Sequence, residues 1–494
     1  MSKNKEKLNE AFGDISSNFI ESTVKPPSRK KAVWVRLVAA VVCVAVMISA
    51  IIAVGIIMNR KNKPIIREPS WTDGGRSEDY DPESYLKYVL LDAEYPEMAK
   101  YPGDGKYGTP EYEAWRKDFE MRLEYSGAGE DLDEFFAETI TEFLSGHGEN
   151  NAVYSPLNVY FALAMLAEIT DGNSRQQILD LLDAENIEAL RTQAHSIWNA
   201  NYIDEGTVKS ILASSLWLDE EYSFHEDKLN ILKEYYYSSV FSGDLGTDET
   251  NFAFRSWLNE QTGGLADRLS DIELDPNTVL ALVTTMQFAA RWTDGFSVDK
   301  TEADVFHSPN GDMECDFMNS DGTKEYYWGD NFSAVEMCLT NSGKMFFILP
   351  DEDVSIDELL SDEEALRFIT NEKNEWKKSK TTWVEFSVPK FDVQSDMNLK
   401  NGLQNLGVSD CFNEAVSDYT SITDHTGIYV DKIQHGAGVK IDEEGVVASA
   451  LTDVRLMLSP APSGKVNFTL DRPFIFVITG NDGTPLFVGV VNQP

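Results

Sequence analysis

The sequence predicts an α+β protein with large antiparallel sheets and surrounding helices, preceded by one N-terminal transmembrane helix. From residue 131 onward, helical and strand-like apolar patterns alternate without the regular rhythm of βαβ units. The hydrophobic content of 42% is sufficient for a large core. One long stretch near the N-terminus contains no charged residue. These three observations separate a folded region from a membrane-spanning one.

The uncharged stretch runs from Leu37 to Met58 and reads LVAAVVCVAVMISAIIAVGIIM. It is long enough to cross a bilayer core of roughly 30 Å. A cleaved signal peptide has a shorter apolar region, of about 7–15 residues, followed by small residues at the cleavage site. This stretch instead ends in IIMNRKNK. We therefore expect an uncleaved single-pass anchor, with a buried core helix as the less favoured alternative.

The anchor divides the chain into four expected segments. Residues 1–36 are polar and charged and are expected to form a cytoplasmic tail, because Lys and Arg are slightly more frequent before the anchor at 37–58 than after it. Residues 59–129 are rich in Pro, Gly, Tyr and Glu and are expected to form a stalk or N-terminal extension, with one helix near Tyr112–Leu123. Residues 130–494 are expected to form the folded domain, on the extracellular side of the cell membrane.

Two segments at the start of this domain predict helices. The segment DLDEFFAETITEFLSG, from Asp131, has apolar residues at helical spacing and acidic residues in its first turn, where the helix dipole favours them. Ser155 and Pro156 provide a cap and a first helical residue for an almost wholly apolar, and therefore buried, helix. Strands are predicted in the runs TVLALVTTMQFAARW, KMFFILP, WVEFSVPKFDV, FIFVITG and TPLFVGVVNQP.

The charge and the cysteines exclude several classes of function. The net charge is −41 and the acidic excess lies after residue 67, so nucleic acid is not an expected partner. The four cysteines, Cys43, Cys315, Cys338 and Cys411, have neither metal-ligand spacing nor a recognisable disulfide framework. They are interpreted as buried thiols, and no metal ion or cofactor is expected.

The sequence does not predict an enzyme. It contains no G-x-S-x-G, H-E-x-x-H, P-loop or EF-hand motif. The glycines of GDGKYG, residues 103–108, fit a dinucleotide fingerprint, but this segment follows a proline rather than a strand. His435 lies beside small residues and is interpreted as a structural hydrogen-bonding group. No catalytic residue is assigned.

The segment after Gly445 has an unusual pattern. From Val446 to Leu456 every second residue is apolar or small, while the other face ends in charge, which is typical of a strand with one face on a core. The chain then continues into SPAPSG, residues 459–464, which suits an exposed loop. The segment is either an ordinary edge strand before a loop or a strand held in reserve. After cleavage, about ten new backbone hydrogen bonds would release on the order of 10 kcal/mol.

From about Asp131 to Pro494 the chain resembles the serpins, a family of serine protease inhibitors. Six motifs are similar to those of the family and follow in the same order: NAVYSPLNVYFALAML, FRSWLNEQTGGLADRL, LVTTMQFAARWTDGF, VPKFDVQSDMNLKNGLQNLGVSDCF, HGAGVKIDEEGVVASA and DRPFIFVI. The resemblance implies the serpin fold, with a large central antiparallel sheet and an exposed reactive-centre loop, in a monomer. It also implies suicide-type inhibition, in which a serine protease cuts the loop, forms a covalent acyl-enzyme and is trapped when the loop inserts into the sheet.

The resemblance assigns a hinge that begins the insertion and a bond that the protease cuts. The hinge comprises Glu443, Glu444, Gly445, Val446, Val447, Ala448, Ser449, Ala450 and Leu451. Counting forward from Glu443 places the cut at Ser459–Pro460, whereas counting back from Phe468 places it at Pro462–Ser463. A bond before proline is a poor substrate, so Leu458–Ser459 is preferred and Met457–Leu458 is the next alternative.

The family also implies a hydrogen-bonded cluster beneath the part of the sheet that opens. The corresponding residues here are Ser155, Asn158, Thr284, Trp292 and His435. Asn158 and Thr284 stand where the family has Ser and Asn, so an Asn moved across the cluster restores its hydrogen-bonding capacity.

The residues around the reactive bond define the expected target. An apolar Leu458 before a small Ser459 implies an elastase-, chymotrypsin- or subtilisin-like serine protease. The alternative is a non-inhibitory serpin-fold protein used for binding or display, to which the Pro-rich segment 459–464 is also suited. In both interpretations the anchor makes the lipid bilayer a partner.

Overall fold

The computed structural model describes residue 81 and residues 83–262, 273–370, 376–431, 433–446 and 464–494. The chain divides into two units, residues 1–68 and 69–494, and all described residues belong to the second. Among them no helix has the length and apolar character that a membrane span requires. The anchor predicted at 37–58 lies outside the described residues.

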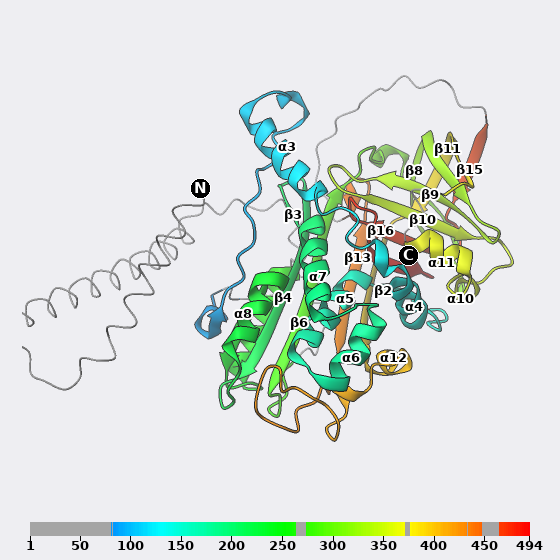
Figure 1. The fold of residues 1–494 in the computed structure, drawn as a ribbon. Coiled ribbons are helices and arrows are strands. Elements are labelled where there is room, and N and C mark those ends of the chain that lie inside the picture. The colour runs from blue at the N-terminus through cyan, green and yellow to red at the C-terminus, as the bar shows by residue number, and fades with distance from the viewer. Residues whose placement is uncertain (1–80, 82, 263–272, 371–375, 432, 447–463) are drawn as a thin grey trace, which may run out of the picture. The chain divides into compact units, whose positions relative to one another are not determined.

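The described residues contain two large sheets (Figure 1). In the first, the short strand β3 (Ile203–Asp204) pairs with β4 and the remaining strands follow in the order β1 (Val89–Leu91), β5 (Ser238–Gly243), β4 (Val208–Asp219), β6 (Leu280–Arg291), β14 (Gly445–Val446), β13 (Gln434–Ile441) and β12 (Phe391–Asn398). The non-consecutive numbering shows that segments distant in the sequence meet in this sheet.

The second sheet contains most of the C-terminal strands. Strand β7 (Glu302–Ser308) pairs with β8, and the others follow in the order β15 (Lys465–Thr469), β11 (Ser379–Pro389), β8 (Gly311–Trp328), β9 (Phe332–Cys338), β10 (Lys344–Pro350), β16 (Phe474–Thr479), β17 (Pro485–Val491) and β2 (Ala152–Tyr154). The strands predicted in KMFFILP, FIFVITG and TPLFVGVVNQP are confirmed as β10, β16 and β17.

Helices surround these sheets. They are α3 (Pro110–Leu123), α4 (Asp133–Leu144), α5 (Pro156–Ile169), α6 (Gly172–Leu181), α7 (Ile187–Asn201), α8 (Glu226–Tyr236), α9 (Asp248–Thr262), α10 (Ile356–Leu359), α11 (Glu363–Thr370) and α12 (Lys400–Asn405). The predicted helices are confirmed as α3, α4 and α5. Ser155 caps α5 by accepting a hydrogen bond from the Asn158 N–H, and every residue of α5 is buried.

Two strand pairs depart from the expected antiparallel arrangement. Strand β5 runs parallel to β4, and β15 runs parallel to β11. The first pair follows from the connection, because the chain leaves β4, passes through α8 and returns to the same end of the sheet before β5 begins. The sheets are therefore mixed, although most of their pairs are antiparallel.

The part of the first sheet around β4 is covered on both faces. Leu212 and Leu216 belong to the main core, which also contains α5 and much of the second sheet. Ala213 and Trp217 point to the opposite face, because neighbouring side chains in a strand alternate. There they pack with Phe254 and other apolar residues of α9.

The described part of the predicted stalk is folded onto the domain. Strand β1 forms the outer edge of the first sheet, antiparallel to β5. Helix α3 follows it, and its Trp115 is buried. Residues 83–129 are therefore part of the same packed unit as the domain that begins near residue 130.

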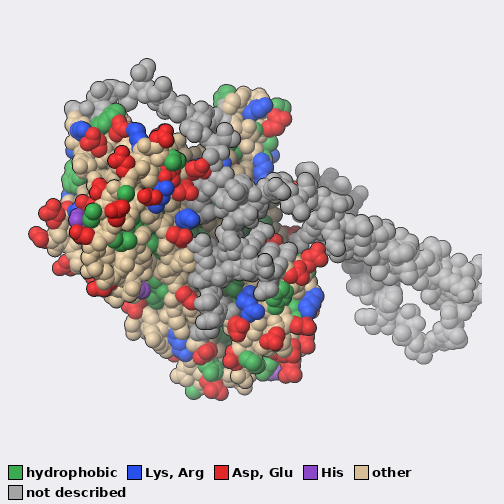
Figure 2. All heavy atoms as spheres, turned by 180° about the vertical axis from the view of Figure 1, so that it is seen from behind, with side chains coloured by type: hydrophobic (Ala, Val, Ile, Leu, Met, Phe, Trp, Pro, Cys, Tyr) green, Lys and Arg blue, Asp and Glu red, His purple; other side chains and the backbone are tan. Residues whose placement is uncertain are grey.

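The surface carries many charged side chains and two accessible cysteines. Figure 2 shows acidic side chains spread over one face, with Lys and Arg interspersed among them. Of the cysteines, Cys411 is buried as expected, whereas Cys315 is partly exposed and Cys338 is exposed. The interpretation of all cysteines as buried thiols is wrong for these two, because both lie in strands of the second sheet that have an accessible face.

Candidate functional site

The hinge begins inside the first sheet. Strand β14 lies between β6 and β13, where Val446 pairs with Ala290 on one side and with Ile441 on the other. Val446 is 2% exposed and belongs to the main core. A Cβ atom on Gly445 would lie 2.3 Å from the Ala290 carbonyl oxygen, so this position requires glycine.

A tight turn places β14 beside β13. The Asp442 carboxylate accepts hydrogen bonds from the backbone N–H groups of Glu444 (2.9 Å) and Gly445 (3.3 Å). The Asp442 N–H donates to the Gly445 carbonyl at 3.0 Å. Beyond this turn, the described residues of β6 and β13 form no ladder with each other. The two strands are thus bridged at one end only.

Glu443 fastens the turn to its surroundings. Its carboxylate is 2.7 Å from Lys390 Nζ and accepts a hydrogen bond of 2.7 Å from Thr301 Oγ1. Burial raises the pKa of the Glu443 carboxyl, but the hydrogen bonds from Lys390 and Thr301 outweigh this effect, so its pKa lies below the usual range. Sequence reasoning did not identify Lys390 or Thr301, although Lys390 lies in the VPKF motif.

Trp292 holds the other side of the same turn. Its backbone N–H donates to the Glu444 carbonyl at 3.1 Å, and its indole Nε1–H donates to the Asp442 carbonyl at 2.9 Å. The Phe296 N–H donates to the Glu443 carbonyl at 3.0 Å. The carbonyls of three successive turn residues are therefore bound by the segment that follows β6.

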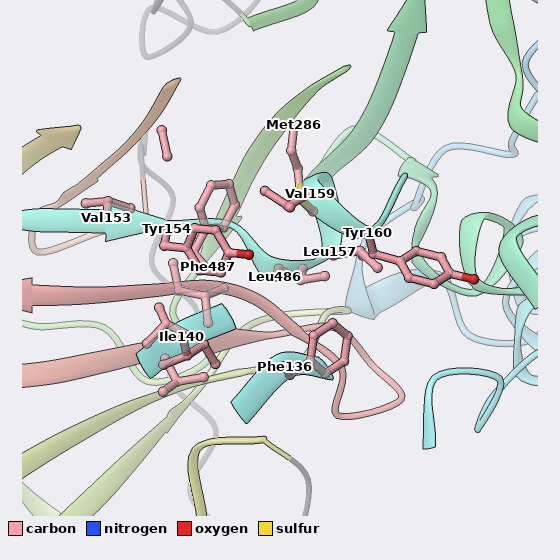
Figure 3. Close-up of a cluster of buried hydrophobic side chains, with 14 of the residues drawn as sticks. Phe136, Ile140, Val153, Tyr154, Leu157, Val159, Tyr160, Met286, Leu486 and Phe487 are labelled. Atoms are coloured by element: carbon pink, nitrogen blue, oxygen red, sulfur yellow. The ribbon is translucent and has the colours of Figure 1, made fainter. Parts of the chain in front are cut away.

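A second set of contacts lies further along β6 and β13, at the N-terminus of α5. The Ser155 N–H donates to Nε2 of the buried His435 at 3.1 Å, which fixes Nε2 as the acceptor. The Ser155 hydroxyl donates to the Leu486 carbonyl at 2.7 Å. Tyr154 lies edge-on to the His435 ring, with centroids 5.3 Å apart. Figure 3 shows Tyr154 and Met286 among the apolar side chains packed around this helix end.

Asn158 joins the same helix end to β6. Its side-chain Nδ2 donates to the Thr284 carbonyl at 3.3 Å, and the Thr284 hydroxyl donates to the Asn158 carbonyl at 3.3 Å. Asn158 Oδ1 is buried without a hydrogen-bond partner. The N-terminal end of α5 is thus bonded to β13 through Ser155 and to β6 through Asn158.

The predicted site residues consequently fall into three groups. Ser155, Asn158, Thr284 and His435 come together at the α5 end, whereas Trp292 lies at the far end of β6 beside the hinge turn. Glu443, Glu444, Gly445 and Val446 form that turn and β14. The remaining predicted residues lie outside the described part of the chain: Val447, Ala448, Ser449, Ala450, Leu451, Met457, Leu458, Ser459, Pro460, Pro462 and Ser463.

Acid is expected to weaken the contact between Ser155 and His435. Burial lowers the pKa of His435 to about 4, whereas an unfolded histidine titrates near about 6.5. Between these values the unfolded chain binds a proton that the native protein does not. The contribution of His435 is therefore fully present above about pH 6.5 and falls by about 3 kcal/mol as the pH approaches 4. Urea unfolding at a series of pH values measures this change.

The histidine contribution is isolated by two variants. His435→Gln removes the titrating group and keeps an oxygen that can accept the Ser155 N–H, so the free energy of unfolding should fall less steeply between pH 6.5 and 4 than in the parent protein. The matched control, His425→Gln, changes an exposed histidine and should retain the parental slope. If the free energy of unfolding of His435→Gln fell with pH as steeply as that of the parent protein, the pH dependence could not be assigned to His435.

Comparisons with known proteins identify the fold that carries this arrangement. The family model described as serpin (serine protease inhibitor) matches residues 130–494. Mouse plasminogen activator inhibitor 1 is 27% identical, over 76% of this chain and 95% of its own length.

Two solved structures share the fold. The thermophilic serpin tengpin in its native state has a TM-score of 0.66 and 24% identity, over 82% of this chain and 99% of its own. Human thyroxine-binding globulin in complex with thyroxine has a TM-score of 0.64 and 20% identity, over 76% of this chain and 99% of its own. Since the family model also spans most of the sequence, the chain belongs to the serpin family, whose members are mostly protease inhibitors rather than enzymes.

Proposed function

We propose that this serpin traps serine proteases by inserting its cleaved reactive loop into the first sheet. The observation that carries the proposal is the position of β14, since the hinge already pairs with both β6 and β13 at one end of the sheet. From β14 towards the N-terminal end of α5, the described residues of β6 and β13 form no hydrogen-bonded ladder with each other. A strand that extended β14 would find unpaired backbone edges on both sides.

The trapping reaction would begin with ordinary acyl transfer. The serine hydroxyl of the protease attacks the carbonyl carbon of Leu458, the peptide nitrogen of Ser459 leaves with a proton, and Leu458 remains esterified to the protease. Residues from Val447 onward then extend β14 between β6 and β13. Extension over about ten residues would release on the order of 10 kcal/mol, which is available to distort the attached protease before water hydrolyses the ester.

The proposed target follows from the residue before the cut. Leu458 suits an elastase-, chymotrypsin- or subtilisin-like protease, with Met457–Leu458, Ser459–Pro460 and Pro462–Ser463 as alternative bonds. The protein would act as a monomer, because a single chain supplies the hinge and both strands that receive it.

We further propose that the inhibitor is tethered to the cell membrane. The uncharged stretch Leu37–Met58 supports a single-pass anchor, and the basic residues before it favour a cytoplasmic N-terminus. The serpin domain would then act on proteases outside the cell.

A second candidate is a non-inhibitory protein that uses the serpin fold for binding. The structure of human thyroxine-binding globulin with thyroxine belongs to a protein of the same fold that holds a small molecule. The Pro-rich sequence of residues 459–464 also favours this candidate, because a bond that precedes proline is a poor protease substrate. The two candidates differ in the fate of the loop and of the protease after cleavage.

Incubation with elastase distinguishes the two candidates. Trapping predicts a covalent band of the summed masses on a denaturing gel, whereas a binding protein is nicked without such a band. Insertion also predicts that the cut protein melts at a higher temperature than the intact one, because the new strand adds hydrogen bonds and buried side chains. Equal melting temperatures would show that no strand has been inserted.

A buried charge at the hinge should convert the inhibitor into a substrate. Val446 is already buried before cleavage, and strand alternation predicts that Ala448 is the next residue to face the core on insertion. Ala448→Glu would then bury a carboxylate only on insertion, at a cost of several kcal/mol, and should abolish the covalent band while cleavage continues. Val447→Glu is the matched control, since the strand alternation predicts that residue 447 faces outward. The measurement is the ratio of trapped to nicked protein. Equal losses in both variants would contradict a hinge that inserts with residue 448 inward.

The anchor is tested by membrane fractionation. The full-length chain should remain with membranes after an alkaline carbonate wash, and deletion of residues 37–58 should release it to the supernatant. Protease added to intact cells should remove the serpin domain and leave the N-terminal tail. Recovery of the full-length chain in the supernatant would rule out the anchor, and protection of the domain would reverse its orientation.

A further inference from the structure

Residues 85–125, here called the brace, lie outside the region matched by the serpin family model and attach to the domain at several places. Val89 and Leu91 pair with β5 at the outer edge of the first sheet. Just beyond β1, the Ala93 N–H donates to the hydroxyl of Ser239 in β5 at 3.1 Å. The brace thus supplies the outermost strand of the sheet that would have to open.

The brace also contacts α9, which covers one face of that sheet. Tyr85 lies edge-on to Phe241 with centroids 5.9 Å apart, and its hydroxyl is hydrogen bonded to Glu260 of α9. Lys87 Nζ is 2.9 Å from the carboxylate of Glu249, also in α9. Gly243 leaves room for the Tyr88 ring, because a Cβ at this position would lie 2.7 Å from it. Helix α9 and β5 are therefore held together by one segment.

Further along, an aromatic stack joins the brace to α7. Tyr95 stacks on Trp198 at a centroid distance of 5.6 Å, and Trp198 is itself stacked on Tyr202 at 4.6 Å and on Tyr237 at 3.6 Å. Trp198 is fully buried. Aromatic pairs of this kind contribute beyond their buried area, so this part of the brace is firmly seated.

The brace is fastened most specifically at Glu205, next to the β3–β4 turn. Glu205 is 1% exposed, and its carboxylate accepts hydrogen bonds from the indole N–H of Trp115 in α3 and from the hydroxyl of Thr207. Asn341 Nδ2 donates to the same carboxylate at 3.1 Å. The Tyr101 N–H donates to the Glu205 carbonyl at 2.9 Å. Glu205 therefore collects donors from the brace, from the β3–β4 turn and from the second sheet.

Asn341, the donor from the second sheet, connects the Glu205 junction to the hinge. Asn341 lies in the turn between β9 and β10. The N–H of its neighbour Thr340 donates to the Arg291 carbonyl at 2.8 Å. Arg291 is the residue of β6 that pairs with Gly445. A short chain of covalent and hydrogen-bonded neighbours thus connects Glu205 to the point at which the loop would begin to insert.

We propose that the brace restrains opening of the first sheet and that Glu205 positions it, so that loss of this junction speeds spontaneous insertion of the uncut loop. Insertion requires β6, with β4 and β5 beyond it, to move away from β13. The brace contacts β5, α9 and α7, and Glu205 links it to Asn341 in the β9–β10 turn of the second sheet, so this movement must break the junction or strain it. The inference depends on the proposed insertion of the loop, but it concerns a segment that the trapping reaction itself does not use.

The carboxylate is chemically necessary in this arrangement. An ionised carboxylate only accepts hydrogen bonds, so both of its oxygens can face donors. Glu205→Gln has almost the same shape but replaces one oxygen with an NH₂ group, which must then face Trp115 on one side or Thr207 and Asn341 on the other. Loss of one charge-assisted hydrogen bond is expected to accelerate opening about tenfold.

The test uses uncut protein and needs no protease. Purified Glu205→Gln is incubated at moderately raised temperature, and conversion to a form that resists unfolding is measured on urea gradient gels. The conversion rate should rise about tenfold over the parent. Trp115→Phe keeps an aromatic ring and removes the N–H donor, so it should raise the rate as well and provides a milder variant if Glu205→Gln folds poorly. Arg116→Ala, on the exposed side of α3, is the matched control and should convert at the parental rate.

The possible outcomes distinguish failure of the brace proposal from failure of the proposed trapping mechanism. Faster conversion in Glu205→Gln and Trp115→Phe, with Arg116→Ala unchanged, would support the brace. Parental rates in both junction variants, in a protein whose elastase-cut form does gain thermal stability, would overturn the brace and leave loop insertion intact. A cut form that gains no stability would remove insertion, and the brace as a restraint on insertion would fall with it.

Discussion

The hydrogen bonds between the N-terminal end of α5 and strands β6 and β13 are the constraint on which the rest of the structure depends. Ser155 reaches His435 on one strand, and Asn158 reaches Thr284 on the other. Because α5 is buried along its whole length, this helix end cannot follow one strand away from the other without losing one set of bonds. The spacing between β6 and β13 is therefore set by a helix beneath them rather than by a ladder between them.

The other end of the same space is held by different chemistry. There the ion pair of Glu443 with Lys390 and the hydrogen bonds from Trp292 secure the hinge turn. A buried carboxylate is costly unless it is paired, so this turn is stable only while Lys390 stays in place. Opening must therefore break neutral hydrogen bonds at the α5 end and preserve an ion pair at the hinge end. This asymmetry favours insertion that starts at β14 and proceeds towards α5.

The sequence predicted the local elements well and the long-range contacts poorly. Helix α5 was predictable because its cap, its proline and its apolar run lie within one segment, and β10, β16 and β17 because their apolar runs are short and bounded by turn residues. The contact of Glu443 with Lys390 was not, since the residues are far apart in the chain and a single carboxylate has many possible partners. The folding of residues 83–129 onto β5 and α7 was missed for the same reason. A segment rich in Pro, Gly and Tyr resembles a stalk until the aromatic partners in α7 are known.

The brace and the predicted anchor together suggest where an outside signal would act. A pull transmitted along the chain would first load the contacts of Tyr85 and Lys87 with α9, and then strand β1. Strand β1 is a three-residue edge strand with Leu90 exposed, and such a strand has few bonds to lose. The Glu205 carboxylate is buried and accepts hydrogen bonds from three donors, so the brace should separate at this junction later than at β1. Separation of the brace from the domain would thus proceed from its N-terminal end towards α3. The hinge would be affected only after the hydrogen bonds of Glu205 break. Their loss would mark the change from a loosened extension to an opened sheet.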